Sequence, residues 1–128
     1  MFSPAVLKAS GGDLDRLFAT TRRIQTAGYN EWRDWSRVAD IDSSATQQTH
    51  VIEDFLVSIK ALTGGQGRGL LPHLLVQDLL ASGELVQFSD IPLEIDYAFH
   101  IAHTSASVRR PFVQTVVSWL QYSLAHLN

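Results

Sequence analysis

The chain has no cysteine, so it can hold neither a disulfide framework nor a thiolate metal site. It also lacks long apolar runs, and no stretch approaches the roughly 20 residues that span a bilayer. The opening MFSPAVLKASGG lacks the basic flank and apolar core of a signal peptide. Together these absences favour a cytoplasmic protein.

Strong charge of either sign is absent as well. The net charge is −3 and the arginines are scattered, which gives no electrostatic case for a nucleic acid or an acidic membrane as partner. The 45% hydrophobic and 18% charged content is typical of a folded chain. A length of 128 residues fits one domain and is too short for two well-formed ones.

The pattern of apolar residues predicts alternating helices and strands, which is typical of an α/β fold with parallel strands. Helices are expected after the N-cap Ser3, after Asn30 with Trp32 and Trp35 on one face, and from Pro111 onward. Ile52, Phe55, Leu56, Ile59 and Leu62 form the apolar stripe of another helix, and His73 to Ala81 another, ending at Gly83. Strands are expected over residues 17–20, 68–72, 84–88 and 97–103, with an extended segment over 45–52.

The glycine-rich segment GGQGRG does not match a phosphate-binding loop. Such loops follow a strand and open a helix, whereas here Gly64 and Gly65 end a helix and precede a strand. We therefore interpret the segment as a tight helix-to-strand connection. His100 and His103 would lie on opposite faces of a strand and could not share a metal ion. Nucleophile elbows and metal-binding helix motifs are absent, so the sequence predicts no enzyme, cofactor or metal site.

One segment has the chemistry of a binding site. The predicted loop from Thr20 to Tyr29, with Trp32 beyond it, combines hydroxyl, guanidinium and aromatic groups after a predicted strand. Arginine binds carboxylates in a bidentate manner, and open α/β sheets bind ligands beyond the carboxyl ends of their strands. The alternative, left open by the sequence, is a solvated basic loop with Trp32 and Trp35 in the core.

The segment GGQGRGLLPHLLVQDLLASGELV resembles a stretch found in the effector-binding domains of LysR-type transcriptional regulators. The residues that match the family's pattern are Gly65, Gly67, Leu70, Leu71, Pro72, Leu75, Val76, Leu80, Gly83, Leu85 and Val86. Four further segments are similar to family segments that occur in the same order: SPAVL, NEWRDW, YAFHIAH and PFVQTVVSWL. The resemblance thus extends over essentially the whole chain.

This resemblance implies a type 2 periplasmic-binding-protein-like fold, in which two α/β lobes enclose a cleft for a small molecule. Residues 1–128 would form a partial effector-binding domain: about 1–90 the second lobe, and about 91–128 a strand and C-terminal helix that return to the first lobe. The cleft wall would come from Thr20, Thr21, Arg22, Tyr29 and Trp32, and from the helix start at His50, Ile52 and Glu53.

The same resemblance predicts the function of an effector-sensing fragment without its own DNA-binding domain, and hence no direct contact with nucleic acid. Its effector in the intact protein would be a small carboxylate or an amino acid, bound weakly or not at all by the truncated cleft. The C-terminal helix would lose its family partners, which favours a homo-oligomer or, as the alternative function, a free-standing dimerising module. Arg68 replaces an apolar residue of the family, so its strand is expected to be less deeply buried.

Overall fold

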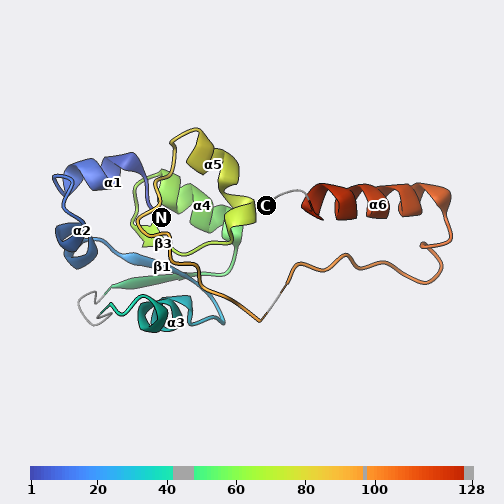
Figure 1. The fold of residues 1–128 in the computed structure, drawn as a ribbon, viewed down its shortest axis with the longest axis horizontal. Helices are drawn as coiled ribbons and strands as arrows, with labels where there is room; N and C mark the ends of the chain where they lie inside the picture. The colour runs from blue at the N-terminus through green and yellow to red at the C-terminus, as the bar shows by residue number, and fades with distance from the viewer. Residues whose placement is uncertain (42–47, 97, 126–128) are drawn as a thin grey trace. The chain divides into compact units, whose positions relative to one another are not determined.

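The computed structural model describes residues 1–41, 48–96 and 98–125. The chain divides into two compact units, Met1–Glu94 and Ile95–Asn128. The first unit is a mixed α/β structure, as the sequence predicts (Figure 1). The described residues leave out Tyr97 of the strand predicted over 97–103 and residues 45–47 of the extended segment predicted over 45–52.

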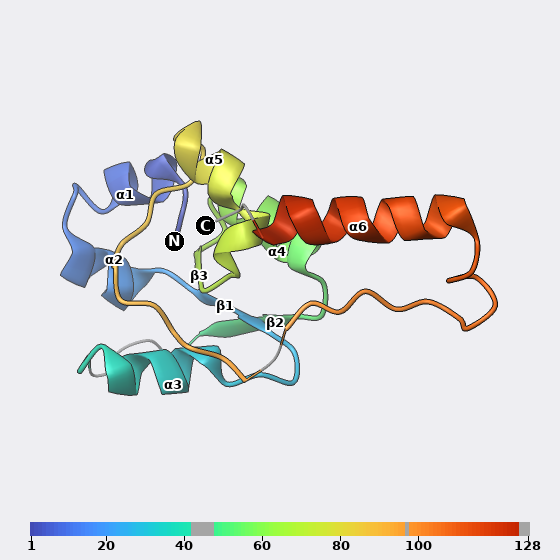
Figure 2. The same ribbon diagram turned by 45° about the vertical axis from the view of Figure 1, so that its right-hand side comes forward.

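The first unit is built on a three-stranded parallel sheet of β1 (Arg23–Thr26), β2 (Thr49–Ile52) and β3 (Arg68–Gly69), in the order β2-β1-β3. The helix α3 lies on one side of the strands and α4 lies on the other, as the two views in Figures 1 and 2 agree. In chain order the elements are α1 (Pro4–Ala9), α2 (Leu14–Thr20), β1 (Arg23–Thr26), α3 (Glu31–Val38), β2 (Thr49–Ile52), α4 (Phe55–Thr63), β3 (Arg68–Gly69), η2 (His73–Leu75) and α5 (Gln77–Ala81).

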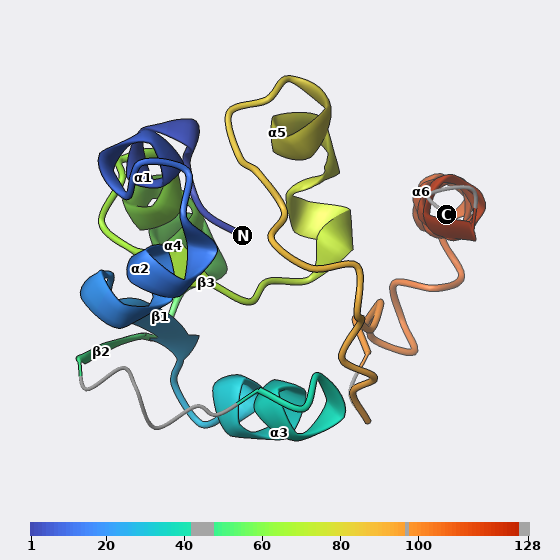
Figure 3. The same ribbon diagram turned by 60° about the vertical axis from the view of Figure 1, so that its left-hand side comes forward.

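The first two residues extend the sheet beyond β3. Gly69 donates its backbone N–H to the Met1 carbonyl at 2.9 Å, and Phe2 and Val86 exchange backbone hydrogen bonds of 3.0 and 2.8 Å. Figure 3 shows the N-terminal segment close to β3. The pairing at Phe2 is antiparallel to both Arg68 and Val86. The strand predicted over residues 84–88 is therefore reduced to a single bridge at Val86.

The strand predicted over residues 17–20 is wrong, because these residues belong to the helix α2. The Asp13 carboxylate caps α2 by accepting the backbone N–H of Arg16 at 3.1 Å. Leu17 is the buried residue of this helix. The strand instead begins at Arg23, inside the predicted polar loop, because Ile24 and Thr26 are buried in alternation with half-buried Arg23 and Gln25.

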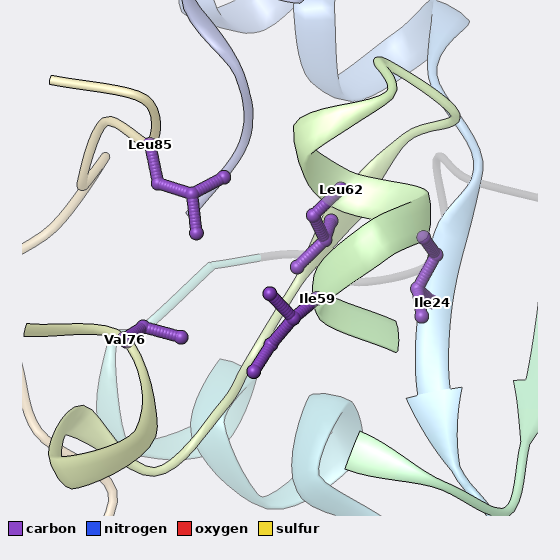
Figure 4. Close-up of a cluster of buried hydrophobic side chains, with 5 residues drawn as sticks. All are labelled: Ile24, Ile59, Leu62, Val76 and Leu85. Atoms are coloured by element: carbon purple, nitrogen blue, oxygen red, sulfur yellow. The ribbon is translucent and has the colours of Figure 1, made fainter. Parts of the chain in front are cut away.

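A small apolar core joins the sheet to α4 and to the segments that follow β3. Its buried side chains, drawn in Figure 4, are Ile24, Ile59, Leu62, Val76 and Leu85. Ile59 and Leu62 confirm part of the predicted α4 stripe, but Leu56 is exposed and Ile52 belongs to β2. Leu62 fits because Gly69 has no side chain: a Cβ there would lie 2.9 Å from the Leu62 Cδ1.

The glycine-rich segment connects α4 to β3, as predicted. Gly64 caps α4, and Gly67 has a φ of 155° with a backbone so close to Arg22 that a Cβ would lie 2.4 Å from its carbonyl oxygen. The helix predicted over residues 73–81 is divided into η2 and α5, because the backbone of Val76 departs from helical geometry with a φ of −128°.

The second unit contains the predicted C-terminal helix, α6 (Pro111–Ala125), and none of the described residues of α6 is buried. The strand predicted over 97–103 is wrong for the described residues 98–103, which are exposed and pair with no strand. Apolar alternation alone does not form a strand without a neighbour to supply its backbone hydrogen bonds. Within the described part of the chain, no helix is both long and apolar enough to cross a membrane.

Candidate functional site at the carboxyl edge of the sheet

The parallel strands β1 and β2 end side by side, at Thr26 and Ile52. We call residues 26–31, which follow from the end of β1, and residues 52–54, which follow from the end of β2, the carboxyl edge. The Ala27 N–H donates to the Ile52 carbonyl at 3.1 Å, which links the two halves of the edge. The helices α3 and α4 both begin here. Open α/β sheets bind ligands at such positions, so the carboxyl edge is the candidate site.

A tight turn shapes the first half of the carboxyl edge. The Tyr29 N–H donates to the Thr26 carbonyl at 3.3 Å, and the Gln25 side-chain amide donates to the Tyr29 carbonyl at 2.8 Å. Gly28 has a φ of 81°, which glycine adopts without strain, and a Cβ at this position would meet no atom within 4 Å. The turn therefore leaves open space beside the end of β1.

Three of the predicted ligand-binding residues lie at the carboxyl edge. The Tyr29 side chain is exposed, Ile52 is half-buried against the apolar core, and Glu53 is exposed. Asp54 follows as the N-cap of α4, and its carboxylate accepts the backbone N–H groups of Leu56 and Val57 at 2.7 and 3.1 Å. Tyr29 and Glu53 are thus placed where a ligand could contact them.

Thr20, Thr21 and Arg22 lie at the other end of β1. The prediction that they share one loop with Tyr29 is wrong, because the four residues of β1 separate them. The Thr20 hydroxyl donates to the Arg16 carbonyl at 2.7 Å, and the Arg22 Nε donates to the Gln48 side chain at 2.8 Å. These three residues belong to the amino end of the strand.

The two remaining predicted residues are engaged within the sheet and the core. His50 is an exposed residue of β2, in register with Ile24. Trp32 is buried, and its indole N–H donates to the Ile24 carbonyl at 2.9 Å. The indole N–H of Trp32 therefore holds α3 against β1 and is not available to a ligand. This agrees with the alternative interpretation of the sequence, in which Trp32 lies in the core.

Sequence reasoning missed Glu31, the first residue of α3. Only 8% of Glu31 is exposed, and its Oε2 atom is buried without a hydrogen-bond partner. Burial raises the pKa of the Glu31 carboxyl, and the negative charge of Asp34 raises it further. Hydrogen bonds from its own backbone N–H and from the Thr26 side chain lower the pKa and offset part of this rise. In the sequence, Glu31 looks like an ordinary acidic residue in a first helical turn, so the only signal was its position next to Trp32.

Arg68 is the second residue that the sequence misplaced. Instead of lying in a shallow strand it is 1% exposed, which contradicts the prediction. Its guanidinium donates through Nη1 to the Thr21 carbonyl at 2.6 Å and to the Thr21 hydroxyl at 2.8 Å. It also lies over the rings of Phe18 and Trp32, at 4.5 and 5.3 Å from the ring centroids. Hydrogen bonds and aromatic contacts together make the burial of this charge tolerable.

The rings around Arg68 form one cluster, which we call the aromatic layer: Phe2, Phe18, Trp32, Trp35 and Phe88. Phe88 contacts the other four rings at centroid distances between 5.1 and 6.1 Å. Arg23 pairs in register with Arg68 and lies over Trp32 at 5.8 Å. Burial, and then the charge of Arg23, lower the pKa of Arg68 to about 10. Because its rings pack on one another and on the arginines of β1 and β3, the aromatic layer is a structural support for the sheet.

No three histidine, cysteine, aspartate or glutamate side chains among the described residues are placed to hold a metal ion. Comparison of the chain with models of protein families, with curated proteins and with solved structures gave no match. The fold and the site therefore define the chain as a small α/β protein whose candidate binding surface is the carboxyl edge of a parallel sheet.

Proposed function

We propose that the chain is the effector-sensing part of a LysR-type transcriptional regulator, with the carboxyl edge as one wall of its ligand cleft. The single observation that carries this proposal is the shared carboxyl edge of β1 and β2, where two helices begin and Tyr29 and Glu53 are exposed. The resemblance of the segment from Gly64 to Val86 supports it independently. The proposal includes the type 2 periplasmic-binding-protein-like fold and a cytoplasmic location, and assigns no DNA contact to this chain.

A wall without its opposing lobe buries only part of a ligand, so we expect weak binding. Small ligands derive affinity from being largely enclosed, and half a cleft loses much of that contact. In the intact regulator, closure of the two lobes on the effector would change the angle between them. The ligand would shift the equilibrium between the open and closed conformations, and this chain would contribute one of the two closing surfaces.

The test is an NMR titration of the isotopically labelled chain with small amino acids, carboxylates and amines. We expect saturable shifts of backbone amides at residues 26–31 and 52–54, with dissociation constants on the order of 1 mM. Tyr29→Ala should weaken the response, whereas Glu84→Ala, which changes an exposed residue beyond α5, should leave it unchanged. Shifts confined to other regions, or none at all, would contradict the proposal. Micromolar binding would show that the chain encloses its ligand without a second lobe.

The alternative function is a dimerising interaction module, favoured by α6. Phe112 is 76% exposed and Trp119 63% exposed, and the helix Pro111–Ala125 carries no charged side chain. A second copy could cover this surface without burying a charge. Sedimentation velocity over a range of concentrations separates the two functions. A dimer that Trp119→Ser dissociates supports the module, and a monomer at all concentrations excludes it.

A further inference from the structure

The strand β2 is an edge strand, and in the described part of the chain its only strand partner is β1 (Figure 3). The backbone carbonyls of Gln48 and Ile52 accept N–H groups from the β1 side of the sheet, at 2.9 and 3.1 Å. Successive residues of a strand direct their backbone groups to opposite sides, so Thr49 and Val51 present theirs away from β1. The outer side of β2 therefore offers N–H and C=O groups to a further strand.

This edge also lacks the side chains that usually protect an exposed strand. Natural edge strands commonly carry proline, lysine or an inward-pointing charge, which prevents another strand from pairing. The four residues of β2 include neither a proline nor a formally charged side chain. Val51 is 62% exposed, on the face of the sheet that also carries Gln25, its partner in register. An apolar side chain beside open backbone groups is a surface that an added strand covers well.

Residues 98–103 have the complementary properties. They are exposed and pair with no strand, although bulky apolar side chains alternate along them as in a strand. Phe99, which is 57% exposed, and Ile101 would share one face of the extended segment. None of the described residues of the second unit is buried, so the segment has no core of its own to pack against. It lacks a neighbouring strand, and so does the outer side of β2.

Charge favours one orientation of such a pair. Neither β2 nor residues 98–103 contain a formally charged residue, so the charges that matter lie at the ends. Glu53 follows β2 directly, and Asp96 precedes the segment. An antiparallel pair would bring these two carboxylates together, whereas a parallel pair would place His103 near Glu53 instead. The parallel orientation also continues the parallel order of the existing sheet.

A second copy of the chain supplies both missing partners. Within the described part of a single chain, the edge of β2 and residues 98–103 are both present and yet unpaired. Two copies provide two edges and two segments, so a reciprocal exchange would pair all four and close the assembly as a dimer. We propose that β2 binds residues 98–103 of a second copy as an added parallel strand, with Phe99 and Ile101 on the face that carries Val51. This pairing is independent of the ligand proposed for the carboxyl edge, and it uses a surface other than α6.

The experiment is a complementation test with two variants, followed by sedimentation velocity. Val51→Lys places a charge on the edge of β2 and leaves the segment intact, whereas Phe99→Asp alters the segment and leaves the edge intact. Both side chains are largely exposed, so each variant should keep its fold. We expect the wild type to dimerise with a dissociation constant on the order of 10 μM, and each variant alone at least about tenfold more weakly. An equimolar mixture contains one intact edge and one intact segment, so it should form a heterodimer more tightly than either variant dimerises alone.

Two further measurements make the test specific. Val38→Lys is the matched control, because Val38 is 58% exposed at the end of α3 and should leave the dimer unchanged. Hydrogen exchange of the wild-type chain reports on the backbone of β2 directly and needs no variant. Exchange of the Val51 amide should slow by at least about tenfold as the dimer forms, whereas that of His50, which faces β1, should change little.

Four results would overturn the proposal. A wild type that stays monomeric at about 1 mM has no such interface. A mixture that associates no more tightly than the separate variants shows that the edge and the segment do not pair. A dimer that Trp119→Ser dissociates, and that Val51→Lys and Phe99→Asp leave intact, assigns the interface to α6. Slow exchange of the Val51 amide in a monomer, at every concentration, shows that the chain covers its own edge without a second copy.

Discussion

Replacing Arg68 by methionine, lysine and alanine separates the contribution of its charge from that of its volume. The side chain is almost fully buried, and it donates two hydrogen bonds to Thr21. Burial and the neighbouring Arg23 lower the pKa of Arg68 to about 10, which corresponds to roughly 3 kcal/mol against the charged form. Two hydrogen bonds from a charged donor contribute about 1.5–3 kcal/mol each, and the aromatic contacts about 1 kcal/mol more.

The hydrogen bonds and aromatic contacts together contribute about 4–7 kcal/mol against a cost of about 3 kcal/mol, so the charge of Arg68 is expected to add at least about 1 kcal/mol of net stability. Arg68→Met keeps most of the volume and leaves the Thr21 carbonyl without this donor, so we expect it to lower the free energy of unfolding by about 1–2 kcal/mol. Arg68→Ala also opens a cavity beneath the aromatic layer, and should lower it by about 4 kcal/mol. Arg68→Lys retains a buried charge but not the planar fork that reaches Thr21, so it should be less stable than Arg68→Met.

Urea unfolding followed by tryptophan fluorescence measures these differences. In a Trp119→Phe background the signal comes from Trp32 and Trp35 alone, which both belong to the aromatic layer. The dependence of the unfolding free energy on urea concentration should stay constant across the series, since the surface exposed on unfolding barely changes. Equal losses for Arg68→Met and Arg68→Ala would refute the reasoning, because they would show that charge, and not volume, makes Arg68 stabilising. So would a lysine variant more stable than the methionine variant.

Two further predictions concern the carboxyl edge and the connection before β3. The pKa of Glu31 is raised in the folded chain, so its contribution to stability is fully present below the unfolded pKa of about 4.5 and is lost as pH rises through the higher folded pKa. Glu31→Gln should therefore gain stability relative to the wild type as pH rises above about 4.5, and a pH-independent difference in urea unfolding would contradict this. Gly67→Ala would place a Cβ 2.4 Å from the Arg22 carbonyl oxygen and should lower the free energy of unfolding by about 3 kcal/mol. Gly83→Ala is the control: Gly83 has a φ of 77° and a Cβ there meets no atom within 4 Å, so the loss should be about 1 kcal/mol. Equal losses at the two glycines would show that the close approach at Gly67 relaxes without cost.

The sequence predicted the elements whose signals are local. Caps, glycines and periodicity predict α3, α4 and α6, and also the glycine connection between α4 and β3. The same local signals misled at residues 17–20, where LFAT looks apolar enough for a strand. There the cap at Asp13 and a single buried face at Leu17 favour a helix. Periodicity over four residues cannot distinguish these two outcomes.

The candidate site was only partly predictable, because its residues depend on where β1 lies. Once the strand moved from residues 17–20 to Arg23–Thr26, Thr20 and Arg22 came to lie at the amino end, while Tyr29 and Glu53 stayed at the carboxyl edge. Glu31 and Arg68 were missed for a related reason. A charged residue is assigned to the surface by default, and only the tertiary arrangement shows which charges are enclosed.

Both buried charged groups are hydrogen-bonded within the fold: the Glu31 carboxyl by its own backbone N–H and the Thr26 side chain, and Arg68 by Thr21. Arg68 is enclosed by groups that suit it: the Thr21 acceptors and the electron-rich faces of Phe18 and Trp32. Arg68 thereby links the sheet to the aromatic layer. Glu31 lies at the end of the same sheet where ligands of α/β proteins bind, yet its Oε2 atom is enclosed without a donor. Of the two, only Glu31 lies at the carboxyl edge, so its charge, unlike that of Arg68, adds to the acidic character of the candidate site.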